Sequence, residues 1–276
     1  MEWWQSLLLG LIQGLTEFLP VSSSGHLMIF KTLLGVDAEG FLDFTVLVHL
    51  GTVCSTLVVF WGAIAKLFRG LFRFRYNDET DYICKLIVSM IPVAVVGVCF
   101  KDFVEGLFGD TLTWVAAGLL VTALLLLLSD FAGRKRASAS TAPSEKHRNG
   151  ISYLQAFLVG IGQAVAVAPG ISRSGATIST GLLSGVQRGV MAQFSFLMVL
   201  VPIIGEQLLD VVKSVSATGH FFSGEVSPLC LAIGFAAAFL SGLFACKVMI
   251  ALVRRAKLSW FALYCAVVAV LIFILT

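Results

Sequence analysis

Long apolar runs separated by short polar loops make up most of this 276-residue chain. A helix that crosses the hydrocarbon core of a bilayer needs about 20 mostly apolar residues. The pattern therefore predicts an all-α polytopic membrane protein. Six runs meet the required length and each predicts one spanning helix, at about 41–64, 82–101, 112–131, 189–211, 226–251 and 257–275.

Two further apolar stretches, about 3–35 and 151–187, are interrupted by polar and helix-breaking residues. Pro20 and the Ser-Ser-Ser-Gly-His run at 22–26 break the first, and the Pro-Gly-Ile-Ser-Arg-Ser-Gly run at 169–175 breaks the second. Backbone freed at membrane depth is tolerated only inside protein or beside water. Each stretch is therefore predicted to be a re-entrant helical hairpin.

Basic clusters at 66–75, 134–148 and 254–257 predict the orientation. Loops rich in Lys and Arg face the cytoplasm. All three clusters can face the cytoplasm only if the stretch 151–187 enters the membrane and leaves it again on the same side. Both termini are then expected to be external, with the site opening to the outer side of the membrane.

The two halves of the chain resemble each other. Residues 14–25 parallel residues 163–175, with one residue inserted after the proline. Three spans separate the two hairpins, and because three is odd the halves have opposite orientation. Such inverted repeats place a binding site near the midplane, where the breaks meet. We predict one membrane domain over 1–276, divided into a first repeat at 1–131, a cytoplasmic basic loop at 132–150 and a second repeat at 151–276.

Composition agrees with the membrane assignment. Hydrophobic residues make up 58% of the chain and charged residues 13%, whereas soluble domains carry about 25% charged residues. The net charge of +3 is small and its basic residues lie in short loops, so nucleic acid is not an expected partner, whereas membrane lipids are.

The first break carries candidate catalytic residues. Gln13 and Glu17 are four residues apart and share one helix face, and a carboxylate at hydrocarbon depth is usually functional. Ser23 lies three residues before His26, a spacing that allows a hydroxyl–imidazole pair, and a serine beside a base is the general form of an activated nucleophile.

The second break carries a candidate phosphate site around Arg173. Its planar guanidinium matches phosphate oxygens, while the neighbouring glycines and hydroxyls let donors converge on an anion. Its neighbours in this set are Ser172, Ser174, Gly175 and Thr177. A structural reading is also open: the serines would cap helices, His26 would be a satisfied polar residue, and Glu17 and Arg173 would form only an ion pair. His49, Glu206 and Asp210 stay unassigned.

These two motifs resemble those of the bacterial undecaprenyl-diphosphate phosphatase family, over essentially the whole chain. The resemblance implies hydrolysis of undecaprenyl diphosphate to the monophosphate at the outer face of the cytoplasmic membrane. That reaction recycles the lipid carrier for peptidoglycan synthesis, and it implies bacitracin resistance. Members are similar in needing a divalent cation, Mg²⁺ or Ca²⁺.

When the family's motifs are matched to this sequence, the resemblance implies that Ser23 is the nucleophile, His26 the proton-transfer residue and Arg173 the phosphate-binding residue. Its acidic motif falls on Gln13 and Glu17, so that Glu17 is the metal ligand and the amide of Gln13 a weaker one. The proton of Ser23 would pass to Glu17 or His26, and a nucleophilic His26 is a variant. The same hairpins would bind substrate through Ser22, Ser24, Gly25, Ser172, Ser174, Gly175 and Thr177.

Two other functions would use a similar set of residues. A prenyl-phosphate transporter or flippase would use the same pocket without chemistry. A lipid phosphatase of the vanadium-haloperoxidase superfamily needs a spaced histidine and aspartate after its arginine, but no histidine follows Arg173 until His220. The sequence leaves oligomeric state open, a homodimer included.

Overall fold

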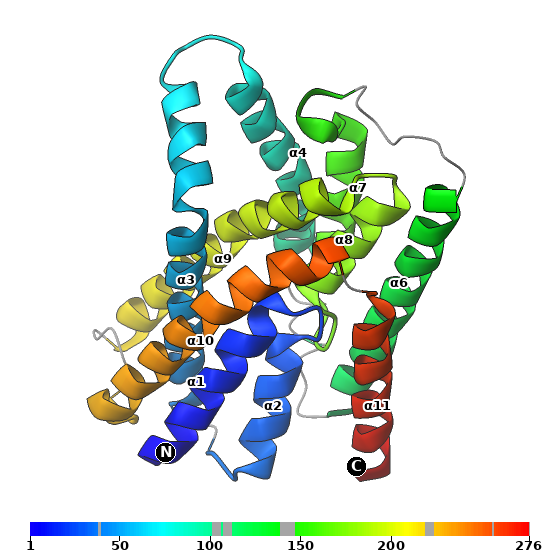
Figure 1. The fold of residues 1–276 in the computed structure, drawn as a ribbon. Coiled ribbons are helices and arrows are strands. Elements are labelled where there is room, and N and C mark those ends of the chain that lie inside the picture. The colour runs from blue at the N-terminus through cyan, green and yellow to red at the C-terminus, as the bar shows by residue number, and fades with distance from the viewer. Residues whose placement is uncertain are drawn as a thin grey trace.

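The chain forms a bundle of helices that run at varied angles to one another (Figure 1). The computed structural model describes residues 1–37, 40–100, 106, 112–138, 147–218, 224–255 and 257–275, and the secondary structure within these ranges is entirely helical. The helices are α1 (Trp3–Phe18), α2 (Ser23–Leu33), α3 (Phe41–Leu71), α4 (Asp78–Cys99), α6 (Leu112–Ser138), η1 (Arg148–Gly150), α7 (Tyr153–Val165), α8 (Arg173–Leu183), α9 (Arg188–Thr218), α10 (Pro228–Arg255) and α11 (Ser259–Leu275).

Five helices in the described part of the chain are long and apolar enough to cross a membrane: α3, α4, α6, α9 and α10. They correspond to five of the six predicted spans. The sixth prediction, 257–275, falls on α11, which is apolar but only 17 residues long. The chain is therefore a multi-pass membrane protein.

Both predicted helix breaks are present. α1 ends at Phe18 and α2 begins at Ser23, while α7 ends at Val165 and α8 begins at Arg173. Each second helix starts with a serine cap, because the side chain of Ser22 accepts a hydrogen bond from Gly25 N and that of Ser172 accepts one from Gly175 N. Such caps satisfy amides that the first helical turn leaves without partners.

The two hairpins share further hydrogen bonds at positions 150 residues apart. Gln5 Oε1 accepts from Glu2 N and Gln155 Oε1 from Ser152 N, at 2.7 and 2.9 Å. Gln5 Nε2 also donates to Leu34 O, as Gln155 Nε2 does to Ser184 O. Equivalent residues of the two hairpins are thus 150 positions apart both before the break and after it. The one-residue insertion that the sequence comparison predicted after the proline is therefore not needed to match them.

Small residues let each hairpin approach a helix from the other half of the chain. A Cβ at Gly14 of α1 would collide with Ser241 of α10, and a Cβ at Gly160 of α7 would collide with the backbone oxygen of Ser89 on α4. Close backbone approach at small residues is typical of helix packing in membranes. The first hairpin is thus held by α10 and the second by α4.

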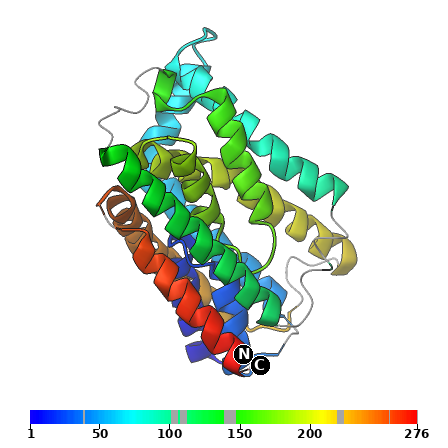
Figure 2. The same cartoon turned by 90° about the vertical axis from the view of Figure 1, so that its right-hand side faces the viewer.

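The second break is also fixed against α6. Gly170 has φ +81° and lies against the backbone of Val115, while a Cβ at Gly118 would collide with Pro169 O. α6 continues alongside α11 in both views (Figure 1, Figure 2). This packing leaves no room for larger residues where the second hairpin turns.

A buried ion pair ties α4 to the segment that precedes α7. Lys85 Nζ lies 2.6 Å from Asp81 Oδ2 and donates to Arg148 O at 2.7 Å. Asp81 also accepts from Asn149 and from the hydroxyl of Tyr153. Both charged groups are almost fully buried, at 3% and 4% exposure, so each offsets the desolvation cost of the other.

Candidate active site

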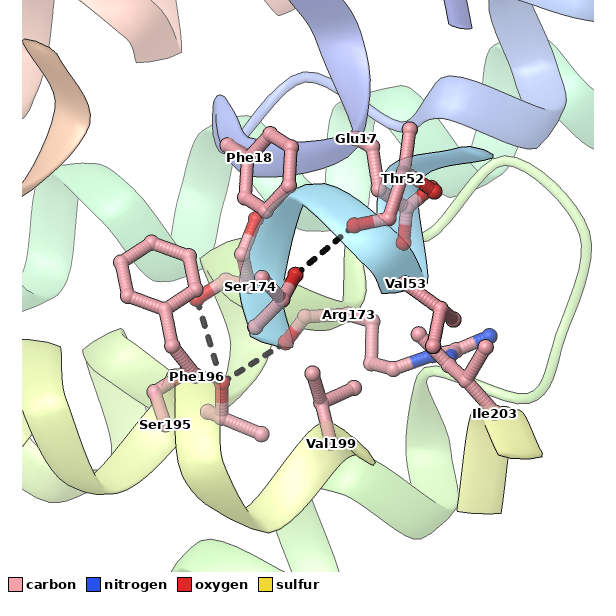
Figure 3. A pocket seen from close by; sticks show the side chains of 12 residues that line it. Glu17, Phe18, Thr52, Val53, Arg173, Ser174, Ser195, Phe196, Val199 and Ile203 are labelled. Atoms are coloured by element: carbon pink, nitrogen blue, oxygen red, sulfur yellow. Dashed lines mark hydrogen bonds between the residues drawn. The ribbon is translucent and has the colours of Figure 1, made fainter. Parts of the chain in front are cut away.

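The two helix breaks meet at a pair of adjoining hollows, of about 400 and 370 Å³ including their open mouths. Glu17 of the first hairpin and Arg173 and Ser174 of the second line both hollows. Figure 3 shows the larger one, where the side chains of Glu17 and Arg173 enter from different hairpins. The predicted convergence of the two breaks on one site is therefore present in the structure.

Glu17 is the centre of a cluster of polar contacts. One of its oxygens, Oε2, accepts from Ser23 Oγ at 2.5 Å and from Gln13 Nε2 at 2.9 Å. The same oxygen lies 3.8 Å from His49 Nε2 of α3. Hydrogen bonds to an ionised carboxylate are short and strong, so these contacts fix the carboxylate beside the serine.

Ser23 has the geometry of a nucleophile beside a base. It is the first residue of α2, and helix N-termini favour anions. Its hydroxyl points its proton at the Glu17 carboxylate rather than at an imidazole. Ser22 is buried as the helix cap, whereas Ser24 is exposed and lines the smaller hollow.

His26 is turned away from Ser23. Its Nδ1 lies 2.8 Å from Ser22 O, its Nε2 lies 2.7 Å from the hydroxyl of Tyr264, and its ring stacks on that of Tyr264. The hydroxyl–imidazole pair allowed by the sequence spacing is absent, because both ring nitrogens have other partners. The base within reach of Ser23 is Glu17.

Arg173 stands at the first turn of α8, the position that Ser23 has in α2. Its helix start is held by Ser172 N, which donates to Thr122 Oγ1, and by Ser174 Oγ, which donates to Leu19 O in the other hairpin at 3.1 Å. Thr177 lies one turn on, 2.6 Å from Ser195 Oγ. The predicted residues of the second break therefore support the arginine and join the two breaks.

The sequence prediction left several nearby residues without a role. His49 and Thr52 of α3 line the hollows, and Tyr264 of α11 binds His26. A polar face along α3, formed by His49, Thr52 and Thr56, was the available signal within an otherwise apolar run. The side chains of Glu206 and Asp210 lie outside the described residues.

The donor set beside Ser23 fits a divalent cation. Glu17 supplies a carboxylate, and Gln13 Oε1 is a buried oxygen with no hydrogen-bond partner among the residues that the structure describes. Carboxylate and amide oxygens are the ligands that Mg²⁺ and Ca²⁺ prefer. Within the described ranges no three His, Cys, Asp or Glu residues gather around one point, so water or substrate oxygens would complete the coordination.

Fold and site together define the class: a multi-pass helical membrane protein with a carboxylate, serine and arginine in one pocket between two broken hairpins. The chain belongs to the family described as bacitracin resistance protein BacA, whose model matches residues 6–271.

Relatives in this family carry the name undecaprenyl-diphosphatase. The protein of Bacteroides fragilis strain ATCC 25285 is 51% identical over 270 residues, covering 98% of this chain and 97% of its own length. That of Parabacteroides distasonis is 51% identical over 267 residues, covering 97% and 96%. A more distant one, from Halothermothrix orenii, is 37% identical over 275 residues, covering 100% and 98%.

Proposed function

We propose that this protein hydrolyses undecaprenyl diphosphate to undecaprenyl phosphate and inorganic phosphate, at the outer face of the bacterial cytoplasmic membrane. The observation that carries the proposal is the 2.5 Å hydrogen bond from Ser23 to Glu17 in a pocket that Arg173 also lines. The relatives' printed name supplies the substrate. The product is the lipid carrier for peptidoglycan synthesis, and the family description agrees with bacitracin resistance.

The first chemical step follows from the Ser23–Glu17 pair. Ser23 Oγ attacks the terminal phosphorus while its proton passes to Glu17 Oε2. The bond from that phosphorus to the bridging oxygen breaks, and undecaprenyl phosphate leaves with the bridging oxygen. The guanidinium of Arg173 and the amides at the start of α8 stabilise the phosphoryl group in transit.

The second step returns the enzyme to its starting state. Glu17 first releases to solvent the proton that it took from Ser23. Water then attacks the phosphorus of phosphoserine 23 and gives its proton to Glu17, the bond from the phosphorus to Ser23 Oγ breaks, Glu17 returns the proton to Ser23 Oγ, and inorganic phosphate departs. A divalent cation held by Glu17 and Gln13 would offset the negative charge of the diphosphate during both steps. His26 keeps the first turn of α2 in place through Ser22 and Tyr264.

The prenyl chain needs an apolar path out of the polar pocket. The lining of the larger hollow also includes the apolar residues Phe18, Val53, Phe196, Val199 and Ile203. Many side chains on the outer surfaces of the helices are large and apolar as well. The diphosphate would therefore bind between the breaks while the chain extends over apolar side chains into the bilayer.

The proposed membrane arrangement keeps six spans, with α11 as the sixth, and two re-entrant hairpins in an inverted repeat over 1–131 and 151–276. The hydrogen bonds repeated at 150 residues and the matched packing of α1 on α10 and of α7 on α4 support it. Both termini lie at the end of the molecule opposite the basic turn between α3 and α4 (Figure 1). That placement supports external termini and a site that opens outward.

A second candidate function is transport of a prenyl phosphate through the same pocket, since broken helices at matched positions of two halves are a transporter architecture. A carrier would keep its lipid movement in the Ser23→Ala variant, because it needs no nucleophile. Lipid flipping by Ser23→Ala protein in proteoliposomes, at the wild-type rate and without phosphate release from either protein, would favour the transporter.

The direct test is phosphate release from undecaprenyl diphosphate by the detergent-purified full chain, with Mg²⁺, Ca²⁺ or EDTA. Release that needs a cation and is lost in Glu17→Gln supports the proposal. Folded wild-type protein that binds the lipid but releases no phosphate under any of the three conditions would contradict it.

A further inference from the structure

His49 faces the proposed catalytic carboxylate from outside both hairpins. It lies on α3, its side chain is 14% exposed, and its Nε2 is 3.8 Å from Glu17 Oε2. It lines the smaller hollow together with Ser23 and Arg173. An imidazole nitrogen is thus presented to the space where the diphosphate would bind.

The other ring nitrogen fixes what Nε2 can do. His49 Nδ1 lies 2.8 Å from Thr45 O, and a carbonyl oxygen only accepts hydrogen bonds, so Nδ1 carries the hydrogen. In the neutral ring Nε2 then presents a lone pair. An imidazole whose Nδ1–H is held by a backbone carbonyl is the usual arrangement of a metal-ligating histidine.

Nε2 and Glu17 Oε2 therefore face each other as two electron-pair donors. At 3.8 Å they are too far apart for a direct hydrogen bond, and a cation between them would bind both. Gln13 offers a third oxygen close by. Its Nε2 donates to the same Glu17 oxygen, and its Oε1 is buried and has no hydrogen-bond partner in the described part of the chain.

We propose that His49 Nε2 is a protein ligand of the divalent cation, together with the Glu17 carboxylate and Gln13 Oε1. The inference rests on the proposed function for its biological meaning, because the cation and the diphosphate would share the smaller hollow. It assigns to α3 a part of the site that neither motif contains.

A nitrogen ligand from His49 would change which metal ions the site prefers. Imidazole nitrogen suits transition metals, whereas Mg²⁺ and Ca²⁺ take oxygen ligands, and Mn²⁺ binds oxygen ligands but stands at the start of the transition-metal series. His49→Gln replaces the nitrogen by an amide oxygen. The variant is therefore expected to bind Mn²⁺ at least about tenfold more weakly, with a smaller loss for Ca²⁺.

The test uses Mn²⁺ alone as a probe on the detergent-purified full chain, with electron spin echo modulation as the readout. Wild type is expected to show the ¹⁴N coupling of a bound imidazole. The coupling should disappear in His49→Gln and in His49→Asn, and it should persist in His26→Gln, whose ring contacts Ser22 and Tyr264 instead. Size-exclusion elution checks that each variant is folded.

Absence of ¹⁴N coupling in wild type, its persistence in a His49 variant, or failure of wild type to bind Mn²⁺ would each overturn the proposal. The wild-type spectrum decides even if both His49 variants fail to fold. Phosphate release with Mg²⁺ from the same samples separates the two claims. Phosphate release without nitrogen coupling would contradict cation binding by His49 and leave the phosphatase proposal standing. Nitrogen coupling without phosphate release would support cation binding by His49 and contradict the phosphatase proposal.

Discussion

The two hairpins are built alike but carry different chemistry. Each begins with a helix whose third residue is a glutamine that accepts a hydrogen bond from the N-cap amide, and each resumes after its break with a serine cap, at positions 150 residues apart. The first residue of the second helix is Ser23 in one hairpin and Arg173 in the other. Equivalent backbone positions therefore present a serine hydroxyl from one hairpin and a guanidinium from the other to the same hollow, and the proposed mechanism uses them as nucleophile and phosphate-binding group.

The surroundings of the two short helices also differ. α8 buries seven of its eleven residues, whereas α2 buries three of eleven. The start of α8 is fixed by Thr122 and by close backbone contact with α6 at Gly118, while the start of α2 is fixed by side chains at Glu17 and Tyr264. The second hairpin is thus fixed mainly by close backbone packing, whereas the first is fixed by polar side chains, of which Glu17 also has a part in the proposed mechanism.

The largest effect is expected from removing the nucleophile. Ser23→Ala should lower kcat by on the order of 10⁴-fold or more, as in other enzymes that lose the attacking hydroxyl, while substrate binding is retained. Phosphate release and lipid binding measure the two separately. Thr32→Ala, which removes an exposed hydroxyl of the same helix that donates to Met28 O, is the control. Equal losses in both variants would show that Ser23 has no special role.

Arg173 should have the next largest effect. Arg173→Ala is expected to reduce turnover on the order of 10²–10³-fold, because a charge that stabilises the transferred phosphoryl group is lost. Arg173→Lys keeps the charge but not the planar fork, and should recover only part of the rate. Kinetics of both variants give the comparison, and full activity of Arg173→Lys would contradict bidentate phosphate binding.

A smaller effect is expected from the support of α2. Tyr264→Phe removes the hydroxyl partner of His26 Nε2 and keeps the ring stack. Loss of one hydrogen bond is worth about 1 kcal/mol, so turnover should fall roughly fivefold. A loss as large as that of Ser23→Ala would instead place His26 in the chemistry itself.

The smallest effect on turnover is expected at the buried pair beside the second hairpin. Lys85→Met leaves the Asp81 carboxylate buried without its ammonium partner, which costs about 3–5 kcal/mol of stability, while activity per folded molecule stays near wild type. Lys66→Met is the control, because the Lys66 side chain is 76% exposed and an exposed pair contributes about 1 kcal/mol or less. Thermal unfolding in detergent distinguishes them; similar midpoints for both variants would show that the buried pair does not hold α4.

Five of the six predicted spans and the two breaks were predictable because apolar run length, Pro20 and Gly170 act locally along the chain. The convergence of Glu17, Ser23 and Arg173 was predictable because charges are expensive in a membrane and must meet. Contacts between residues that lie far apart in the sequence were not predictable. His26 bonds Tyr264, 238 residues away, and His49 reaches Glu17 from a helix that reads as an ordinary span. The Asp81–Lys85 pair at four-residue spacing reads as an exposed helix pair until the segment at 148–153 covers it.

In the proposed mechanism, Ser23 carries the phosphoryl group between two steps. Acid and alkaline quenching of a single turnover with undecaprenyl diphosphate labelled at the terminal phosphate, followed by peptide mass spectrometry, tests it directly. The account predicts an acid-stable phosphoserine at Ser23 that is absent in Ser23→Ala. An acid-labile label on His26, or phosphate release at the wild-type rate with no labelled protein at any time point, would contradict it.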